Sequence, residues 1–262
     1  MDKRAKFYTR AINEWISDKD ATILIIAGGQ NDYQVFKTLE YNNVLITNLD
    51  SRLDQDSFPL YDFELQNAES LTYHDSAFDY VVVNASLHHC SSPHKSLIEM
   101  YRVARKGVIA IESRDSFLMK LLVKVGLVEQ YETRAVYDND FKYGGVNCSE
   151  IPNYAYRWTE NEIEKTIKAF MPIGEHNFFF KYGNEKDFNK IKKINRPILI
   201  VLNLIKILYK VFILIFPKQQ NLFAFCIIKP DLVNKLHPWL KYKNRKVKLN
   251  KSWFEKRYET SK

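Results

Sequence analysis

Two apolar runs of the chain end in residues that could bind a small molecule. Gly28 and Gly29 directly follow the run 22–27, and Asp50 ends the next run, 21 residues after Gly29. Adjacent glycines let the backbone approach a ligand closely and adopt positive φ without strain. A carboxylate at this distance can accept hydrogen bonds from both hydroxyl groups of a ribose. The spacing therefore predicts a nucleotide site, with a helix-capping role as the alternative for Asp50.

The elements that must position these residues alternate between strand and helix. Continuous runs rich in β-branched residues predict strands buried on both faces, and apolar residues at helical spacing predict the helices between them. Thr159 and Glu162 have the spacing of a capping box at the start of a helix. The alternation predicts a doubly wound α/β sheet that binds its ligand at the carboxyl ends of the strands. The expected strands are 22–27, 43–50, 59–67, 77–86, 107–113, 175–182 and 221–229, and the expected helices are 3–17, 31–40, 92–106 and 159–170.

The composition is that of an ordinary globular protein, with 46% hydrophobic and 27% charged residues among 262. Cys90, Cys148 and Cys226 are far apart in the sequence. This argues against a disulfide framework and a structural zinc site, and no metal site is predicted. The N-terminal residues lack the apolar segment of a signal peptide, so we expect a cytoplasmic protein.

The net charge of +8 comes from the end of the chain. Residues 229–262 contain eleven Lys or Arg and three acidic residues, a surplus of eight, so the preceding residues are neutral overall. A segment of this kind is either simply solvated or attracts nucleic acid or anionic lipid. We expect one domain over 1–230, with insertions at 114–157 and 184–220, followed by a basic tail over 231–262.

The second insertion contains the apolar stretch 198–216. Its nineteen residues are enough to span a bilayer, but Asn203, Lys206 and Lys210 would share one helical face. A lysine near the centre of a span costs about 2.5–3.5 kcal/mol, which argues against spanning. Two alternatives stay open: a helix packed on the protein's own core, and an interfacial helix lying on a membrane.

Several short motifs follow one another between residues 67 and 113. They are Ala68-Glu69-Ser70-Leu71, Asp75-Ser76-Ala77-Phe78-Asp79-Tyr80-Val81, Leu87-His88-His89, Pro93, Glu99 with Arg102-Val103, and Lys106-Gly107. In this order they resemble the middle of the class I S-adenosylmethionine-dependent methyltransferases, in the type 11-like subgroup. The resemblance implies a Rossmann-like sheet of seven mostly parallel strands with an antiparallel last strand, S-adenosylmethionine as cofactor, and methyltransferase activity.

The resemblance also implies a set of cofactor-binding residues. Gly28 and Gly29 would line the methionine part of the cofactor, and Asp50 would bind its ribose. The glycine loop departs from the family pattern, because an apolar residue replaces the acid at the end of the first strand. Asp32 could orient the ammonium group instead. Ala68 and Glu69 would lie at the adenine, and Asn84 and Ala85 beside the sulfonium.

Methyl transfer to oxygen or nitrogen also requires a general base. His88 and His89 follow the fourth strand and would face the methyl group, and of the two we favour His88. The alternative is that the histidine pair is a structural turn packed on the cofactor. Glu112 and Asp115, after the fifth strand, are further candidates, but only burial would make a carboxylate basic enough.

The acceptor is expected beneath the insertion 114–157, with Gly144-Gly145 as a hinge. We expect a small-molecule, glycan or lipid-linked acceptor, in surface-polysaccharide or lipid biosynthesis, and a contact of 198–216 with the inner face of a membrane. Two alternatives are a non-catalytic partner protein and an RNA-interacting methyltransferase that uses the basic tail, although nucleic acid is the less favoured partner. The sequence predicts no oligomeric state. The aromatic residues that could stack on an acceptor or pack in the core are Tyr131, Tyr137, Phe141, Tyr143, Tyr154, Tyr156 and Trp158.

Overall fold

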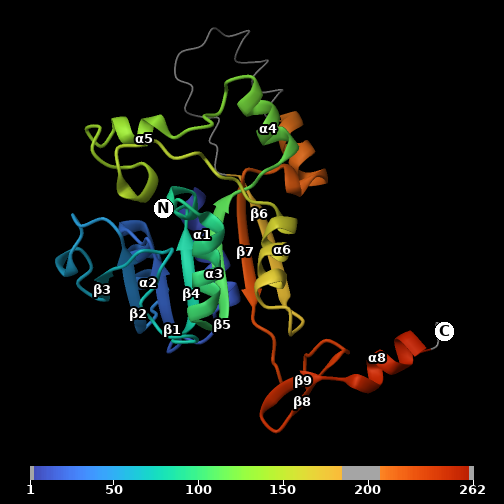
Figure 1. Ribbon diagram of the computed structural model, residues 1–262. Helices are drawn as coiled ribbons and strands as arrows, with labels where there is room; N and C mark the ends of the chain where they lie inside the picture. Colours follow the sequence, from blue (N-terminus) through green and yellow to red (C-terminus); the bar gives the residue numbers. More distant parts are fainter. Residues whose placement is uncertain (1–2, 185–206, 260–262) are drawn as a thin grey trace.

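The computed structural model describes residues 3–184 and 207–259, and its centre is a seven-stranded sheet (Figure 1). The strand order is β3-β2-β1-β4-β5-β7-β6. The first five strands are parallel to one another, and β7 is antiparallel to both β5 and β6. This confirms the expected Rossmann-like sheet. The strands are β1 (Thr22–Ile26), β2 (Asn43–Asn48), β3 (Asp62–Leu65), β4 (Phe78–Asn84), β5 (Ala104–Ser113), β6 (Asn177–Gly183) and β7 (Leu222–Ile228).

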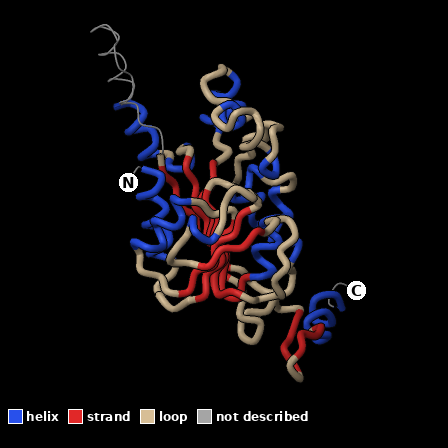
Figure 2. Tube along the Cα trace, turned by 90° about the vertical axis from the view of Figure 1, so that its left-hand side faces the viewer, coloured by secondary structure: helices blue, strands red, loops and turns tan. Residues whose placement is uncertain are grey.

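Helices cover both faces of the sheet, as the tube in Figure 2 shows. On one face, α1 (Lys3–Trp15) and α2 (Gln30–Thr38) pack on one hydrophobic cluster. On the other, α3 (Pro93–Val103) and α6 (Glu160–Phe170) pack on a second. Strand β1 serves both clusters, because Ile23 and Ile25 belong to the first and Leu24 and Ile26 to the second. A strand covered on both sides reads as a continuous apolar run, which is why the sequence pattern located it.

Charged residues from two of the sequence motifs, Asp79 and the pair Glu99–Arg102, connect neighbouring elements of the fold. The Asp79 carboxylate accepts hydrogen bonds from the backbone and hydroxyl of Thr22 and forms an ion pair with Arg105 at 2.8 Å. Glu99 and Arg102 together hold the backbone of Leu71, which donates to Glu99 and accepts from Arg102. These charged residues stabilise the sheet and its connections at a distance from the ligand-binding edge.

Some element boundaries differ from those expected. The predicted helix 92–106 ends at Val103, because β5 already begins at Ala104, where Arg105 and Lys106 reach Asp79. The third strand is only Asp62–Leu65. The capping box of Thr159 and Glu162 is confirmed, with both reciprocal hydrogen bonds formed.

The predicted basic tail is folded in part. It contains the hairpin β8 (Leu240–Lys243) and β9 (Lys246–Leu249), followed by α8 (Lys251–Tyr258), and the rings of Trp239 and Trp253 pack at 5.7 Å. Figure 1 places this unit at the end of the molecule away from α4 (Phe117–Lys124) and α5 (Thr133–Tyr137).

The apolar stretch 198–216 is described only from residue 207, and 198–206 lie outside the described residues. Residues 207–215 form a helix whose apolar side chains are largely exposed, so packing on the core does not account for this part. Within residues 3–184 and 207–259, no helix has the length and apolar character needed to cross a bilayer.

Candidate functional site

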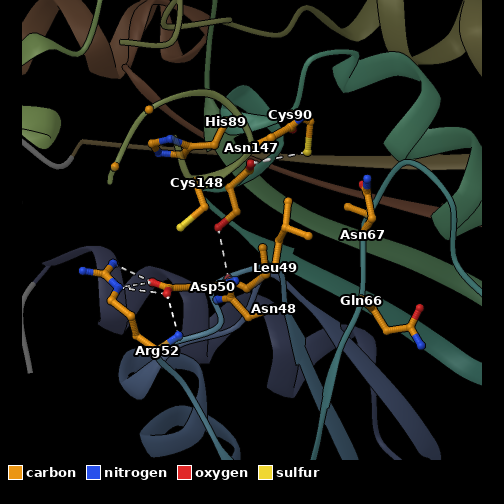
Figure 3. A pocket seen from close by; sticks show the side chains of 15 residues that line it. Asn48, Leu49, Asp50, Arg52, Gln66, Asn67, His89, Cys90, Asn147 and Cys148 are labelled. Carbon is orange, nitrogen blue, oxygen red and sulfur yellow. Dashed lines mark hydrogen bonds and ion pairs between the residues drawn. The ribbon is translucent and has the colours of Figure 1, made fainter. Parts of the chain in front are cut away.

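A cavity opens at the carboxyl ends of β1, β2, β3 and β4 (Figure 3), the edge at which sheets of this type bind ligands. Its floor comes from the residues that follow the strands, and its roof comes from the turn after β4 and from the insertion. The floor residues are Ala27, Asn48, Leu49, Asp50, Arg52, Gln66, Asn67, Ala68 and Ser86, and the roof residues are His89, Cys90, Gly144, Gly145, Asn147 and Cys148.

The ends of β1 and β4 are bent by left-handed residues at the cavity. Ala27 has φ of 49° and Ala85 has φ of 55°, and each such alanine costs roughly 1–2 kcal/mol. After the first bend, the amide of Gly28 donates to the carbonyl of Thr47. A Cβ on Gly28 would lie 2.8 Å from methyl groups of Ile25 and Ile46, so packing requires this glycine, and it does not line the cavity.

Gly29 and Asp32 begin α2, and Asp32 is buried with one oxygen unsatisfied. Its Oδ2 accepts a hydrogen bond from the amide of Gly29 at 3.0 Å, whereas Oδ1 has no hydrogen-bond partner among the described residues. Oδ1 of Asn84 is a second buried acceptor of this kind. Burial raises the pKa of Asp32 to about 6, although the amide of Gly29 and the nearby polar side chains of Tyr8 and Asn84 oppose the rise. Oδ1 of Asp32 and Oδ1 of Asn84 are buried acceptors that fit the ammonium group of the cofactor that the resemblance implies.

Asp50 lines the cavity, but its carboxylate is already engaged by Arg52. The Nε of Arg52 donates to both oxygens, at 2.9 and 3.0 Å, and the second guanidinium nitrogen lies 2.6 Å from Oδ2. The hydrogen bonds from Arg52 lower the pKa of Asp50, so it is ionised at neutral pH. Arg52 also donates to Asn139 and lies 3.9 Å from the ring centroid of Tyr143. Arg52 therefore connects the predicted ribose ligand to the insertion.

His88 is held between two carboxylates and is 9% exposed. Its Nδ1 lies 2.8 Å from Oε2 of Glu112, and its Nε2 lies 3.4 Å from Oε2 of Glu132. Burial by itself lowers the pKa of His88, but Glu112 and Glu132 outweigh it and raise the pKa to about 10. His88 is thus an imidazolium at neutral pH and cannot accept a proton, which supports the structural interpretation of this histidine.

Glu112 is a fixed counter-ion of the turn after β4. It is fully buried, and its Oε1 accepts from the backbone amides of Ser86 and Leu87 at 2.9 and 2.8 Å. Burial raises its pKa, but the charge and hydrogen bond of His88 outweigh this, so the net shift is downward. A carboxylate with these bonds and this shift is a weak base.

His89 is the candidate base that faces the cavity. Its Nε2 lies 3.5 Å from Oε2 of Glu132, and burial together with the charge of His88 lowers its pKa, so it is neutral at pH 7. Asp115 lines a different cavity and pairs with Lys120 at 2.9 Å. Of the four predicted base candidates, the geometry favours His89.

Glu132 comes from the insertion 114–157 and contacts both histidines of the site. The hydrogen bond to His88 and the charge of that histidine outweigh burial and lower the pKa of Glu132 to about 2. Asn153 donates to Glu132 at 3.2 Å and to the carbonyl of His88 at 3.1 Å. One ligand atom each from His88, His89 and Glu132 lie within 4.8 Å, but a cation there would have to displace the proton of His88.

Of the other predicted residues, some line the cavity and others do not. Ala68 lines the cavity, whereas Glu69 accepts a hydrogen bond from the amide of Ser92 at the start of α3 and does not line it. Trp158 is fully buried against Phe225, so it belongs to the core and cannot stack on an acceptor.

Sequence reasoning missed Arg52, Glu132 and Asn153. For Arg52 a signal existed, since it lies two residues after the predicted ribose ligand. Glu132 and Asn153 belong to an insertion without a periodic pattern, and only the folded chain brings them to the histidines.

Comparisons with known proteins concern the domain and the fold. Residues 29–111 match the sequence profile of the family described as "Methyltransferase domain". None of the curated proteins matches the sequence.

Several solved structures are similar in fold. A SAM-dependent methyltransferase from Archaeoglobus fulgidus is 10% identical, with 86% of this chain and 94% of that chain covered and a TM-score of 0.52. A protein from Pyrococcus horikoshii OT3 is 12% identical, with 87% and 91% covered and a TM-score of 0.50. At these identities the likeness concerns the fold alone. Residues 29–111 thus match a methyltransferase domain, and the fold of the chain is that of an S-adenosylmethionine-dependent methyltransferase structure.

Proposed function

We propose that this protein transfers a methyl group from S-adenosylmethionine to an oxygen or nitrogen atom of an acceptor bound beneath the insertion 114–157. The observation that carries the proposal is a neutral histidine, His89, that lines the cavity beside an ionised carboxylate, Glu132. When bound, the cofactor supplies a methyl group that is already electrophilic. The protein has to hold the two reactants, exclude water and take up the proton.

Buried and cavity-lining polar groups would hold the cofactor. Asp32 and Asn84 offer unsatisfied oxygens to its ammonium group, and Asp50 offers a carboxylate to its ribose. Arg52 engages both oxygens of Asp50. The Arg52 side chain therefore has to share the Asp50 carboxylate with the ribose hydroxyl groups, or turn away when the ribose binds. Ala68, which also lines the cavity, would leave room for the adenine.

His89 would accept the proton of the acceptor. An imidazolium formed there faces Glu132, and a hydrogen bond with the backbone of Gly145 also raises the pKa of His89. Both groups stabilise the protonated ring once it forms. His88, already protonated, keeps Glu132 in place and does not exchange protons near neutral pH.

The acceptor would be a glycan or a lipid-linked molecule. The aromatic residues of the insertion favour this class, because Tyr137 and Phe141 are exposed and pack edge to face at 5.6 Å, and Tyr131 and Tyr154 do the same at 5.5 Å. Exposed rings of this kind can stack on sugars. The rival proposal is a non-catalytic partner protein, for which the doubly engaged Asp50 is the supporting observation.

Calorimetric titration with S-adenosylmethionine and S-adenosylhomocysteine tests the cofactor site. We expect both to bind the wild-type protein, and Asp50→Ala to weaken binding at least about tenfold, because two hydrogen bonds to a charged group are lost. Asp56→Ala, which changes an exposed acid nearby, is the matched control and should leave binding unchanged. If neither compound binds at millimolar concentration, the non-catalytic alternative is correct.

His89→Ala tests the chemistry. With methyl-labelled cofactor and a lipid and glycan extract of the organism that encodes the protein, we expect label transfer to fall about 100-fold or more. Cofactor affinity should be preserved, because the change removes the base and leaves Asp32 and Asp50 in place. Equal transfer by wild type and variant would exclude His89 as the base. A chelator added to the wild type shows whether a cation participates.

A further inference from the structure

Two segments at the carboxyl-end edge of the sheet expose many apolar side chains. The first comprises α4 and the residues after it, where Phe117 is 75% and Leu127 is 71% exposed. The second is 207–216, where Leu208 is 67% and Leu214 is 82% exposed. Monomeric soluble proteins rarely expose large contiguous apolar patches, so we expect this surface to contact a partner. We name it the apolar face, and its further members are Leu121, Val125, Val211, Ile215 and Phe216.

The start of α4 is tied to Gln219, which follows the second segment of the apolar face by three residues. The amide of Leu118 donates to the side chain of Gln219 at 3.1 Å, and the hydroxyl of Ser116 donates to the Gln219 carbonyl at 3.4 Å. The register of the sheet explains why they meet, since Ser113 at the end of β5 pairs with Leu222 at the start of β7. Figure 1 shows α4 and the helix 207–215 at the same end of the molecule. The two segments of the apolar face therefore lie at one edge of the sheet, connected through Gln219.

The charge on this surface has a single sign. Residues 117–128 and 207–220 contain Lys120, Lys124, Lys210 and Lys218 and no acidic residue. Lys120 and Lys218 pair with Asp115 and Glu160 at its border. Lys124 and Lys210 are exposed among the apolar side chains. Exposed apolar groups interspersed with lysine match the chemistry of an anionic bilayer surface, where apolar side chains enter the acyl boundary and cations contact headgroups.

We propose that the apolar face docks this protein on an anionic lipid bilayer. The face and the cavity lie at the same edge of the sheet, because α4 and residues 207–216 adjoin strand ends Ser113 and Leu222 on the carboxyl-end side. The basic hairpin and α8 lie at the other end of the molecule, so they do not share this contact (Figure 1). Docking in this orientation would turn the cavity toward the membrane, where the lipid-linked acceptor of the proposed function would reside. The contact itself does not depend on methyl transfer.

Vesicle flotation of the full chain, without cofactor, tests the docking. Vesicles of phosphatidylcholine mixed with phosphatidylglycerol should carry the wild-type protein upward, and vesicles of phosphatidylcholine alone should carry less. Leu214→Glu should reduce partitioning at least about tenfold on both kinds of vesicle. The double change Lys124→Glu and Lys210→Glu should reduce it by a similar factor on the mixed vesicles only. All three side chains are exposed, so the variants should keep the wild-type melting temperature.

Two matched controls lie away from the apolar face. Leu60→Glu changes an exposed leucine just before β3, at the amino ends of the strands, and Lys241→Glu changes an exposed lysine of β8. Neither should alter flotation. The proposal is overturned if the wild type stays unbound, or if the controls reduce binding as much as Leu214→Glu does. It is also overturned if light scattering shows a dimer that Leu214→Glu dissociates while vesicles do not bind, because a second copy then covers the face.

Discussion

Replacing Asp32 with asparagine is expected to stabilise the ligand-free protein and, at the same time, to weaken cofactor binding on the order of 1,000-fold. Asp32 is 5% exposed, and its Oδ1 has no hydrogen-bond partner among the described residues. Burial raises its pKa from 3.8 to about 6, so ionisation costs the folded state about 2–3 kcal/mol at pH 7. Asparagine has the same shape, can still accept from the Gly29 amide, and carries no charge.

The same charge should be indispensable for the ligand. In Asp32→Asn, the ammonium group of the cofactor loses a buried, charged hydrogen-bond partner. Removal of such a partner weakens the binding free energy by about 2–5 kcal/mol. The affinity of the wild-type protein should also fall as the pH is lowered through about 6, because Asp32 then becomes protonated.

The pH dependence of stability gives a second readout with a defined sign. Because the folded pKa of Asp32 lies above the unfolded value, its contribution to stability is complete below about pH 4 and is lost as the pH rises through 6. The stability difference between Asp32→Asn and wild type should therefore be small at pH 4 and full at pH 7. Urea denaturation at both pH values measures it.

Two controls separate the site from general effects. Asp56→Asn removes an exposed carboxylate and should change neither stability nor affinity. 5′-Methylthioadenosine, which lacks the amino-acid part of the cofactor, should bind the wild type and Asp32→Asn equally well. Unchanged affinity of Asp32→Asn for S-adenosylmethionine would show that the ammonium group binds elsewhere.

Replacing His88 with glutamine is expected to destabilise the protein by about 3–5 kcal/mol at pH 7. The change leaves Glu112, which is fully buried, and Glu132 without their shared cation, and breaking a buried ion pair has a cost of this size. His74→Gln, at an exposed histidine, is the matched control and should shift stability by no more than about 0.5 kcal/mol. Denaturant unfolding of the three proteins at pH 7 measures the difference.

The contribution of His88 should disappear in alkaline solution. Its folded pKa of about 10 exceeds the ordinary 6.5, so the stabilisation is complete below pH 6.5 and is lost as the pH rises through 10. The curves of wild type and His88→Gln should therefore converge between pH 7 and pH 10. Adding Glu112→Gln to His88→Gln should restore part of the stability, because it removes one unpaired buried charge. Parallel curves would mean that His88 is neutral in the fold.

His88 and Asp32 are both buried charged groups, but they differ in whether the protein itself supplies their hydrogen-bond partners. His88 is satisfied on both ring nitrogens by the protein itself, and it therefore belongs to the scaffold. Asp32 keeps an unsatisfied oxygen, and it therefore has a partner to gain. His89 lies between these cases, because it is half-buried, neutral and next to Glu132. Proximity to the cavity alone would not have separated the three roles.

The sequence by itself determined the sheet and its ligand-binding edge. Strands such as β1 and β4 are buried on both faces, so each appears as a continuous apolar run, and the loops that follow them must lie at one edge. The capping box at Thr159 was likewise predictable, because it depends on residues three apart. Asp50 was placed at the cavity by the same reasoning, and Ala68 was placed there by the family resemblance.

Only the tertiary structure decided what the charged residues do. The roles of Arg52, Glu112 and Glu132 depend on contacts with groups that lie up to 87 residues away in the chain, at distances that no local pattern encodes. The pKa of His88 rises and that of His89 falls although the two are neighbours in sequence, because burial and nearby charges set the balance for each ring. Local periodicity specifies which segments are buried, but electrostatics depends on three-dimensional distance and desolvation, and these exist only once the chain has folded.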